Sequence, residues 1–195
     1  MKKLSLIVPA FLAIFALNAC HSNSKDTTST ADSANLSKDS STKTASTAPM
    51  TVSENDAKFV VTAAADGMAE VQLGKVAVAK AKSTRVKNFG QMMVTDHSKA
   101  GDELAAIAQK KNITLPTAPD SAAQKKAKEL ALKSGSDFDK GYVDAMVDGH
   151  KKAVKLFEDG IKNLQDTTLK AFAQKTLPTL KMHLDSINAI KKSMK

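Results

Sequence analysis

Three histidines occupy the apolar stripes of stretches that have the periodicity of long helices. His97 follows Met93 by four residues and His150 follows Met146 by four residues, so each pair lies on one helical face. His183 has a similar place in the last such stretch. Imidazole is a common ligand of transition metals, and a thioether on the same face suits a soft ion such as copper(I). These residue types at this spacing point first to metal binding.

Two carboxylates complete the candidate set. Glu70 lies on the apolar face of the first long helical stretch, and Asp96 directly precedes His97. Glu70 and each histidine lie roughly 13 to 17 residues from the start of a helix, which is ~20 to 25 Å along a rod of about 42 Å. Because the middles of neighbouring helices meet whichever way each helix runs, these groups are predicted to share one layer of the core. The predicted metal ligands are Glu70, Asp96, His97, His150 and His183, with Met93 and Met146 as further soft ligands.

The same residues have a second interpretation, in which no metal is bound. Buried polar groups need partners, and a hydrogen-bonded layer that only fixes helix register would meet that need. Methionines at this spacing are also common core fillers. Di-iron bundles carry Glu-x-x-His motifs, but Val94 and Leu180 stand three residues before His97 and His183. This argues against an oxo-bridged di-iron centre and leaves copper, zinc or iron in another kind of site.

The elements that carry these residues are long helices. The stretch from Ser53 to Lys195 lacks the alternating Val, Ile and Thr runs of strands and is rich in helix formers at helical spacing. Ser53 is the expected N-cap of the first helix. We predict an all-α, ferritin-like four-helix bundle with a short extra crossover helix, and with helices at about 54–82, 84–111, 121–133, 137–164 and 167–193.

The order of motifs indicates a duplicated helical hairpin. The Met-Val-x-x-His pattern that ends at His97 returns at His150, and Leu169-Lys-Ala-Phe-Ala-Gln174 resembles Val86-Lys-Asn-Phe-Gly-Gln91. Ser121 is expected to open the short helix between the two hairpins as part of a capping box.

The N-terminus has the layout of a bacterial lipoprotein signal. Lys2 and Lys3 precede an apolar run, Leu4–Ala19, whose sixteen residues are short beside the ~20 that a membrane-spanning helix needs. Leu17-Asn-Ala-Cys20 resembles a lipobox, which predicts a signal peptide over 1–19 and lipidation of Cys20. Since the chain has no other cysteine, no disulfide within it is expected.

Residues 20–52 are dominated by Ser, Thr, Ala, Lys and Asp. Such a composition cannot bury enough apolar surface to offset the entropy lost on ordering, so we predict that this segment is a disordered tether between the lipid and a domain at 53–195. The formal charge of the chain is +9, and loss of Lys2 and Lys3 with the signal leaves +7 (9 − 2) on that domain. A basic exterior suits contact with anionic lipid or cell-envelope polymers.

Other functions lack the residues that they require. The chain has no Gly-x-Ser-x-Gly elbow and no phosphate-binding glycine loop. Arg85 is the only arginine, Tyr142 is the only tyrosine and tryptophan is absent. The chain therefore has few side chains that could stack on bases or make bidentate contacts to them. We therefore identify no catalytic residues and expect no nucleic-acid binding.

A set of short motifs extends over nearly the whole domain. They are Phe59-Val60, Gly67-Met-Ala-Glu70, Val86-Lys-x-Phe89, Met92-Met-x-x-Asp-His97, Ile113-Thr-Leu-Pro116, Gly135-x-x-Phe-Asp-x-x-Tyr142, His150 and Thr176-Leu-Pro-x-x-x-x-His183. In these motifs the chain resembles an exported bacterial family known as domain of unknown function 4142, often described as outer-membrane proteins. The resemblance implies a ferritin-like bundle and brings no established activity.

The sequence thus predicts an exported lipoprotein, anchored through Cys20 at the outer membrane or the periplasmic face of the cell envelope. Its helical bundle is predicted to hold a transition metal in a mid-bundle layer of histidines and carboxylates. The alternative is a metal-free envelope scaffold or stress-related binding protein. In that case the polar layer fixes helix register and the basic surface contacts anionic envelope polymers.

Overall fold

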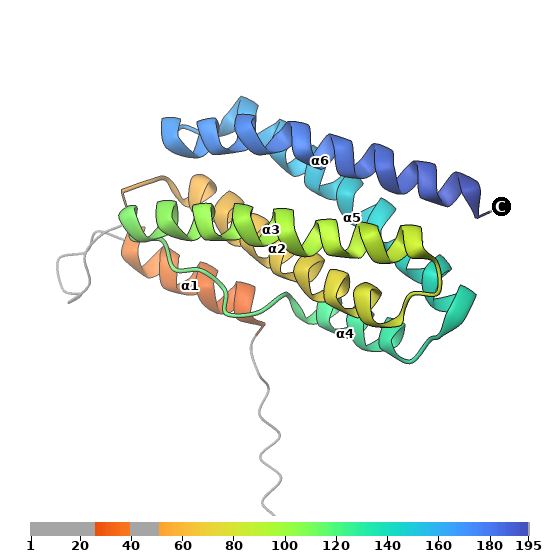
Figure 1. Cartoon of the computed structure of the whole chain (residues 1–195). Helices are drawn as coiled ribbons and strands as arrows, with labels where there is room; N and C mark the ends of the chain where they lie inside the picture. The colour runs from red at the N-terminus through yellow and green to blue at the C-terminus, as the bar shows by residue number, and fades with distance from the viewer. Residues whose placement is uncertain (1–25, 40–50, 195) are drawn as a thin grey trace, which may run out of the picture.

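The computed structural model describes residues 26–39 and 51–194, which fold almost entirely as α-helix (Figure 1). This part of the chain contains no β-strand, and one isolated bridge pairs Ala81 with Gly135. The all-α class predicted from the sequence is therefore confirmed. The helices are α1 (Thr27–Asp39), α2 (Glu54–Lys80), α3 (Thr84–Lys110), α4 (Ser121–Ala131), α5 (Gly135–Asn163) and α6 (Thr167–Ser193).

Four long helices, α2, α3, α5 and α6, surround a common core. Helix α2 contacts α3 and α5, and α6 contacts the same two helices. Each of the four runs antiparallel to the two others of this set that it contacts (Figure 1). Helix α4 lies against α2 and α5 in the connection between the two hairpins, and α1 lies against α2 on the side away from α6 (Figure 1).

The core consists of two apolar clusters with a polar layer between them. One cluster contains Phe59, Phe157 and Phe172, and the other contains Phe89 and Tyr142. Every long helix passes from one cluster to the other, and at the crossing point each carries one buried polar side chain. These side chains are Glu70 on α2, His97 on α3, His150 on α5 and His183 on α6.

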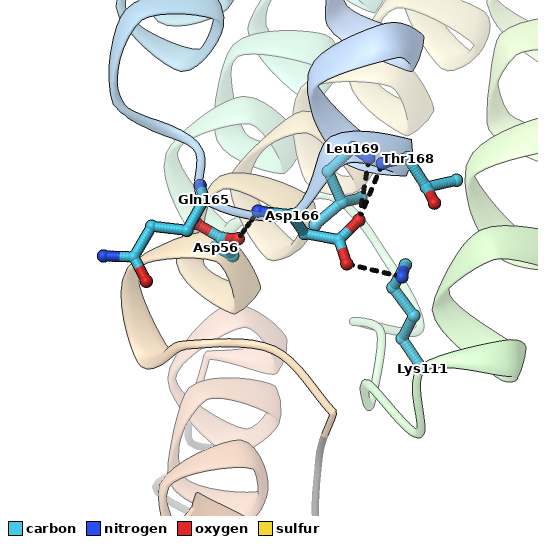
Figure 2. Close-up of polar contacts among 6 residues, drawn as sticks. All are labelled: Asp56, Lys111, Gln165, Asp166, Thr168 and Leu169. Carbon is cyan, nitrogen blue, oxygen red and sulfur yellow. Dashed lines mark hydrogen bonds and ion pairs between the residues drawn. The ribbon is translucent and has the colours of Figure 1, made fainter.

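A buried aspartate closes one end of the four-helix arrangement. Asp56, in the first turn of α2, accepts hydrogen bonds from the backbone N–H groups of Gln165 and Asp166 at 3.2 and 2.7 Å (Figure 2). Both donors lie in the loop between α5 and α6. Asp166 in turn caps the first turn of α6 and binds the Lys111 ammonium at 2.6 Å (Figure 2). The start of α2, the end of α3 and the α5–α6 loop are thereby joined.

The opposite end is closed in the same way by the other hairpin. Asp139, near the start of α5, accepts hydrogen bonds from the backbone N–H groups of Lys82 and Ser83 at 3.0 and 2.8 Å. These donors lie in the loop between α2 and α3. Each hairpin therefore holds the loop of the other with a buried carboxylate.

Local signals set the ends of the helices. The observed ends of α2 to α6 differ from the predicted ranges by at most two residues. Ser53 caps α2 by accepting a hydrogen bond from the Asp56 N–H at 3.2 Å. The capping prediction for α4 is wrong by one residue, because Asp120, rather than Ser121, has the extended backbone of an N-cap and accepts from the Ala123 N–H at 2.7 Å.

The prediction of a disordered tether over 20–52 is wrong for Thr27–Asp39, which form α1. Ala31 and Asn35 of this helix are each only 2% exposed. The Asn35 amide donates to the carbonyl of Thr114 at 3.0 Å and accepts from the N–H of the same residue at 2.7 Å. Composition gave no sign of this helix because contacts with a distant loop, rather than helix propensity, hold it in place.

Other parts of the N-terminal prediction lie outside the described residues. These parts are the signal peptide over 1–19, the lipidation site Cys20 and residues 21–25 and 40–50 of the tether. Among the helices that the structure does describe, none is both long enough and apolar enough to cross a membrane.

Candidate metal centre

The structure brings His97, His150 and His183 together in the polar layer. The ring centroids lie 5.6 Å apart for His97 and His150, and 5.4 Å apart for each of the other two pairs. One nitrogen of each ring lies within 4.8 Å of a nitrogen of each other ring. His150 and His183 are at most 1% exposed, and His97 is 9% exposed. Three helices each contribute one imidazole, so the cluster depends on how those helices pack.

Hydrogen bonds at the periphery fix the tautomers of two rings. Nδ1 of His150 lies 3.0 Å from the carbonyl oxygen of Met146, and Nε2 of His183 lies 2.9 Å from Oδ2 of Asp96. Because both partners can only accept, these two nitrogens carry the protons and donate. In the neutral rings the lone pair is then on Nε2 of His150 and on Nδ1 of His183. Metal-binding histidines are oriented by the same kind of outer partner.

Glu70 reaches the histidines from α2. Its Oε1 lies 3.6 Å from Nδ1 of His150, which is too long for a hydrogen bond. The same oxygen lies over Gly149, where an added Cβ would stand only 2.9 Å from it. A glycine on α5 therefore makes room for this carboxyl group.

The remaining candidate ligands lie around the cluster. The side chain of Asp96 is 33% exposed at the edge of the layer, where it accepts the hydrogen bond from Nε2 of His183. Met93 and Met146 are buried in the apolar cluster that contains Phe89. Met146 contacts the histidine cluster through its backbone carbonyl, which accepts the hydrogen bond from His150. A ligand role for the thioether of Met93 or Met146 stays a prediction.

Burial determines the protonation states in the layer. It lowers the pKa of His97 to about 3 and that of His150 to about 4, with a smaller contribution from neighbouring imidazoles. Burial also lowers the pKa of His183, against the opposing hydrogen bond and charge of Asp96. It raises the pKa of Glu70 to about 8, helped by a nearby carboxylate. At neutral pH the three imidazoles and Glu70 are therefore uncharged, and the imidazole lone pairs are available to a cation.

The layer also gathers the unpartnered polar atoms of the core. Phe89 contacts His150, His183 and Tyr142 with centroid distances of 6.1, 6.3 and 6.4 Å, which places Tyr142 beside the layer. Buried polar groups in proteins almost always have partners. Within residues 26–39 and 51–194, the buried side-chain nitrogen and oxygen atoms without one are Glu70 Oε2, His97 Nε2, Tyr142 Oη, His150 Nε2 and His183 Nδ1.

Sequence reasoning missed two groups that belong to this region. Tyr142 precedes His150 by eight residues, and its unpartnered hydroxyl has a pKa raised by burial and by the nearby Glu70. Asp66 precedes Glu70 by four residues, and burial together with the charge of Asp120 raises its pKa to about 6. The helical spacing i, i+4, i+8 was the signal for both, but a tyrosine or an aspartate at such a position is common in ordinary helices.

Comparison with protein-family models gives a match for this chain. The family model described as "Domain of unknown function (DUF4142)" matches residues 41–190. The chain belongs to the DUF4142 family. The match contains the polar layer, all of α2, α3 and α5, and α6 as far as residue 190, and it begins after α1. A search of the curated proteins found no match.

One solved structure has a similar fold to this DUF4142 chain. It is the "Crystal structure of DUF305 fragment from Deinococcus radiodurans", with a TM-score of 0.63 and 11% sequence identity. The alignment covers 71% of this chain and 96% of that chain. At such low identity the likeness shows a shared helical fold alone.

Proposed function

We propose that this DUF4142 protein binds one transition-metal ion between His97, His150 and His183, with Glu70 beside the ion. One observation carries the proposal. Three buried imidazoles from three helices meet in one layer, and each has a ring nitrogen without a hydrogen-bond partner. An ion would satisfy all three nitrogens at once.

The ligand set suits several metals. Zinc and copper sites commonly contain three histidines and a further position, with bonds to nitrogen of ~2.0–2.1 Å, which holds the nitrogens about 3.4 Å apart. The nitrogens here lie within 4.8 Å of one another, so each ring would move inward by under about 1 Å. Rotations about the side-chain bonds can supply such a shift. Copper, zinc and iron are the ions to be tested.

The metal-free alternative requires polar groups that satisfy one another. A layer that only fixes helix register should pair its donors with its acceptors, because an unpartnered buried group costs about 1–3 kcal/mol. The contacts at the periphery are paired in this way, through Met146 and Asp96. The other ring nitrogens, Nε2 of His97, Nε2 of His150 and Nδ1 of His183, have no hydrogen-bond partner. This pattern favours a ligand at the centre.

We also infer that the four long helices form a ferritin-like bundle. Neighbouring helices are antiparallel, and a long connection that contains α4 joins the two hairpins (Figure 1). Ferritin-like bundles have such a crossover between hairpins and place metals among side chains that point inward from the helices. The position of the histidine layer fits that scheme.

The proposal further places the protein in the cell envelope, anchored by lipid on Cys20. The support is the apolar run and lipobox at the N-terminus. Asp26, where the described part of the chain begins, lies six positions after Cys20, so the chain between them reaches at most about 21 Å. A docked α1 would therefore hold the domain close to the membrane surface, where its basic exterior meets anionic lipid or envelope polymer.

Elemental analysis tests the metal proposal directly. The full chain, purified in detergent without an affinity tag and incubated with Zn²⁺, Cu²⁺ or Fe²⁺, should retain about one equivalent of one of these ions after desalting. The His150→Ala variant should retain less than about a tenth of an equivalent, because the ion loses a ligand at its most buried point. Bound metal should also raise the melting temperature, and a chelator should reverse that rise.

The fourth histidine of the chain provides a matched control. His21 precedes the described residues, and His21→Ala should leave the metal content unchanged. Asp96→Ala should weaken binding by about 10- to 100-fold, as expected for a residue that orients a ligand. If the unmodified chain retains none of the three ions and its melting is unaffected by them, the metal-free scaffold is the better description.

A further inference from the structure

A polar hollow connects two of the three histidines to the outside. It has a volume of about 340 Å³ and lies between α3 and α6. His97 and His183 form part of its wall, together with Asp96, Thr179 and Met182. Asp96 and Met182 are 33% and 47% exposed, so the hollow extends from solvent to the buried layer.

A second hollow also reaches His97, but its walls are of a different kind. It has a volume of about 620 Å³ and lies between α2, α3 and the loop at residues 115–119. Its wall is mostly apolar and includes Leu104, Phe157 and Phe172. A metal ion gives up hydration water only where polar groups replace it, so these apolar walls suit an ion poorly. The apolar hollow also has Asp102 in its wall, but His97 is the only one of the three histidines that it borders. The hollow between α3 and α6 borders both His97 and His183 and offers a carboxylate oxygen at Asp96 and a thioether sulfur at Met182.

An exposed ion pair lies across the polar hollow. The Lys175 ammonium on α6 binds both carboxylate oxygens of Glu103 on α3, at 2.9 and 2.8 Å. Both side chains line the hollow and are exposed, at 66% for Lys175 and 36% for Glu103. The pair thus ties the two helices together at the outer edge of the hollow, and it places a positive charge where a cation would have to pass.

We propose that metal ions reach the three imidazoles through the hollow between α3 and α6, with Asp96 as their first ligand. The Lys175–Glu103 pair restricts this passage. The inference rests on the proposed function, since it concerns the route to the same metal centre. It adds that loading is governed by one side of the molecule and by an ion pair that makes no contact with the bound ion.

The rate of cobalt loading tests the route. Co²⁺ is added to the metal-free full chain in a stopped-flow instrument, and the visible absorption of the bound ion is followed. Lys175→Ala opens the passage and removes one of the two lysine charges that line it, the other being Lys99, so loading should become roughly 3- to 10-fold faster. The matched control is Lys181→Ala, which breaks a similar exposed pair with Glu158, 2.8 Å long, that joins α6 to α5 instead. Its loading rate should equal that of the unmodified chain.

Two cavity-filling variants distinguish the two hollows. Thr179→Phe places a ring in the polar hollow and should slow loading more than about 10-fold, with the final stoichiometry unchanged. Gly101→Leu narrows the apolar hollow, and a Cβ at Gly101 meets no atom within 4 Å, so the backbone tolerates it. This variant should load at the normal rate. Thermal melting of each metal-free variant checks that it is folded.

The outcomes separate the route from the centre itself. Normal final binding with unchanged rates in both Lys175→Ala and Thr179→Phe would overturn the route and leave the proposed centre standing. Slow loading in Gly101→Leu alone would assign the passage to the apolar hollow and also overturn the proposal. If neither Co²⁺ nor the ions Zn²⁺, Cu²⁺ and Fe²⁺ bind to the unmodified chain at equilibrium, the centre and its route both fail.

Discussion

Buried polar groups are partnered at the two ends of the molecule and unpartnered at its middle. Both carboxylate oxygens of Asp56 and both of Asp139 accept a backbone N–H group. In the middle layer, Glu70, His97 and His150 each keep a buried nitrogen or oxygen without a partner. The buried carboxylates that hold loops at the ends are therefore fully hydrogen-bonded. In the layer where the three histidines meet, buried polar atoms lack hydrogen-bond partners.

This difference separates a structural use of buried polar groups from a functional one. Unpartnered polar atoms in a core reduce stability, and proteins accept that reduction mainly at sites where a ligand binds. If the comparison is correct, substitutions at the ends should reduce stability without affecting metal binding. Substitutions in the middle should reduce metal binding without reducing the stability of the metal-free protein.

The largest effect on stability is expected at the ends. Asp56→Ala and Asp139→Ala should each lower the free energy of unfolding by about 3 kcal/mol, because each removes two charge-assisted hydrogen bonds and leaves two N–H groups without a partner. Urea denaturation measures this loss. Metal content per folded molecule should stay normal in both variants.

An exposed aspartate is the control for these two variants. Asp159 pairs with Lys155 at the surface of α5, where the two side chains are 44% and 76% exposed. Asp159→Ala should change the free energy of unfolding by less than about 0.5 kcal/mol. A loss of metal in Asp56→Ala or Asp139→Ala while the protein stays folded would contradict the separation between the ends and the middle.

The middle layer should make the stability of the metal-free protein depend on pH. The pKa of Glu70 is raised to about 8 by burial, so between pH 6.5 and 8 this side chain is already ionised in the unfolded chain but keeps its proton in the folded protein. Stability should therefore fall as pH rises. The net loss over this range should be about 1 kcal/mol, below the ~1.4 kcal/mol per pH unit of Glu70 alone, because the unfolded histidines are still losing protons near pH 6.5. The measurement is urea denaturation in the presence of a chelator.

The histidines act in the opposite direction at lower pH. Their pKa values are lowered, to about 3 for His97 and about 4 for His150, so below pH 6.5 the unfolded chain binds protons that the folded protein excludes. Stability should then fall as pH drops towards 4, which puts the maximum near pH 6.5. Glu70→Gln should abolish the decline between pH 6.5 and 8. A decline of the same size in that variant would show that another group causes it.

The smallest effect is a gain in stability from a change in the middle. Glu70→Met replaces a carboxyl group that has an unpartnered buried oxygen with an apolar side chain of similar length. The metal-free protein should become more stable by about 1 kcal/mol at pH 6, and metal should then stabilise it less than it does the unmodified chain. Thermal melting with and without metal measures both changes. A loss of stability would mean that the carboxyl group has a structural role like that of Asp56.

Much of the fold and of the candidate site could be read from local sequence. Ser53 identifies the start of α2, and the helical spacing of apolar residues identifies all four long helices. The depths of Glu70, His97, His150 and His183 along those helices predicted a shared layer, because rise per residue is constant and the middles of packed helices meet. These inferences depend on neighbours within a few positions in the chain.

Long-range pairing could not be predicted in this way. The helix α1 is held by Asn35 through a residue 79 positions away, and Asp56 holds a loop 109 and 110 positions away. The partner of Asp96 is His183 rather than the adjacent His97, and this contact selects which nitrogen of His183 has the lone pair. No local spacing encodes such choices.

The sequence by itself determined the helices α2 to α6, their approximate ends and the level at which each polar side chain of the layer sits, since these follow from helix geometry and capping. The tertiary structure alone decided which polar groups are satisfied, which nitrogens remain open and which hollow leads to them. Those features depend on the relative rotation and distance of whole helices, and these quantities are set by packing between residues far apart in the chain.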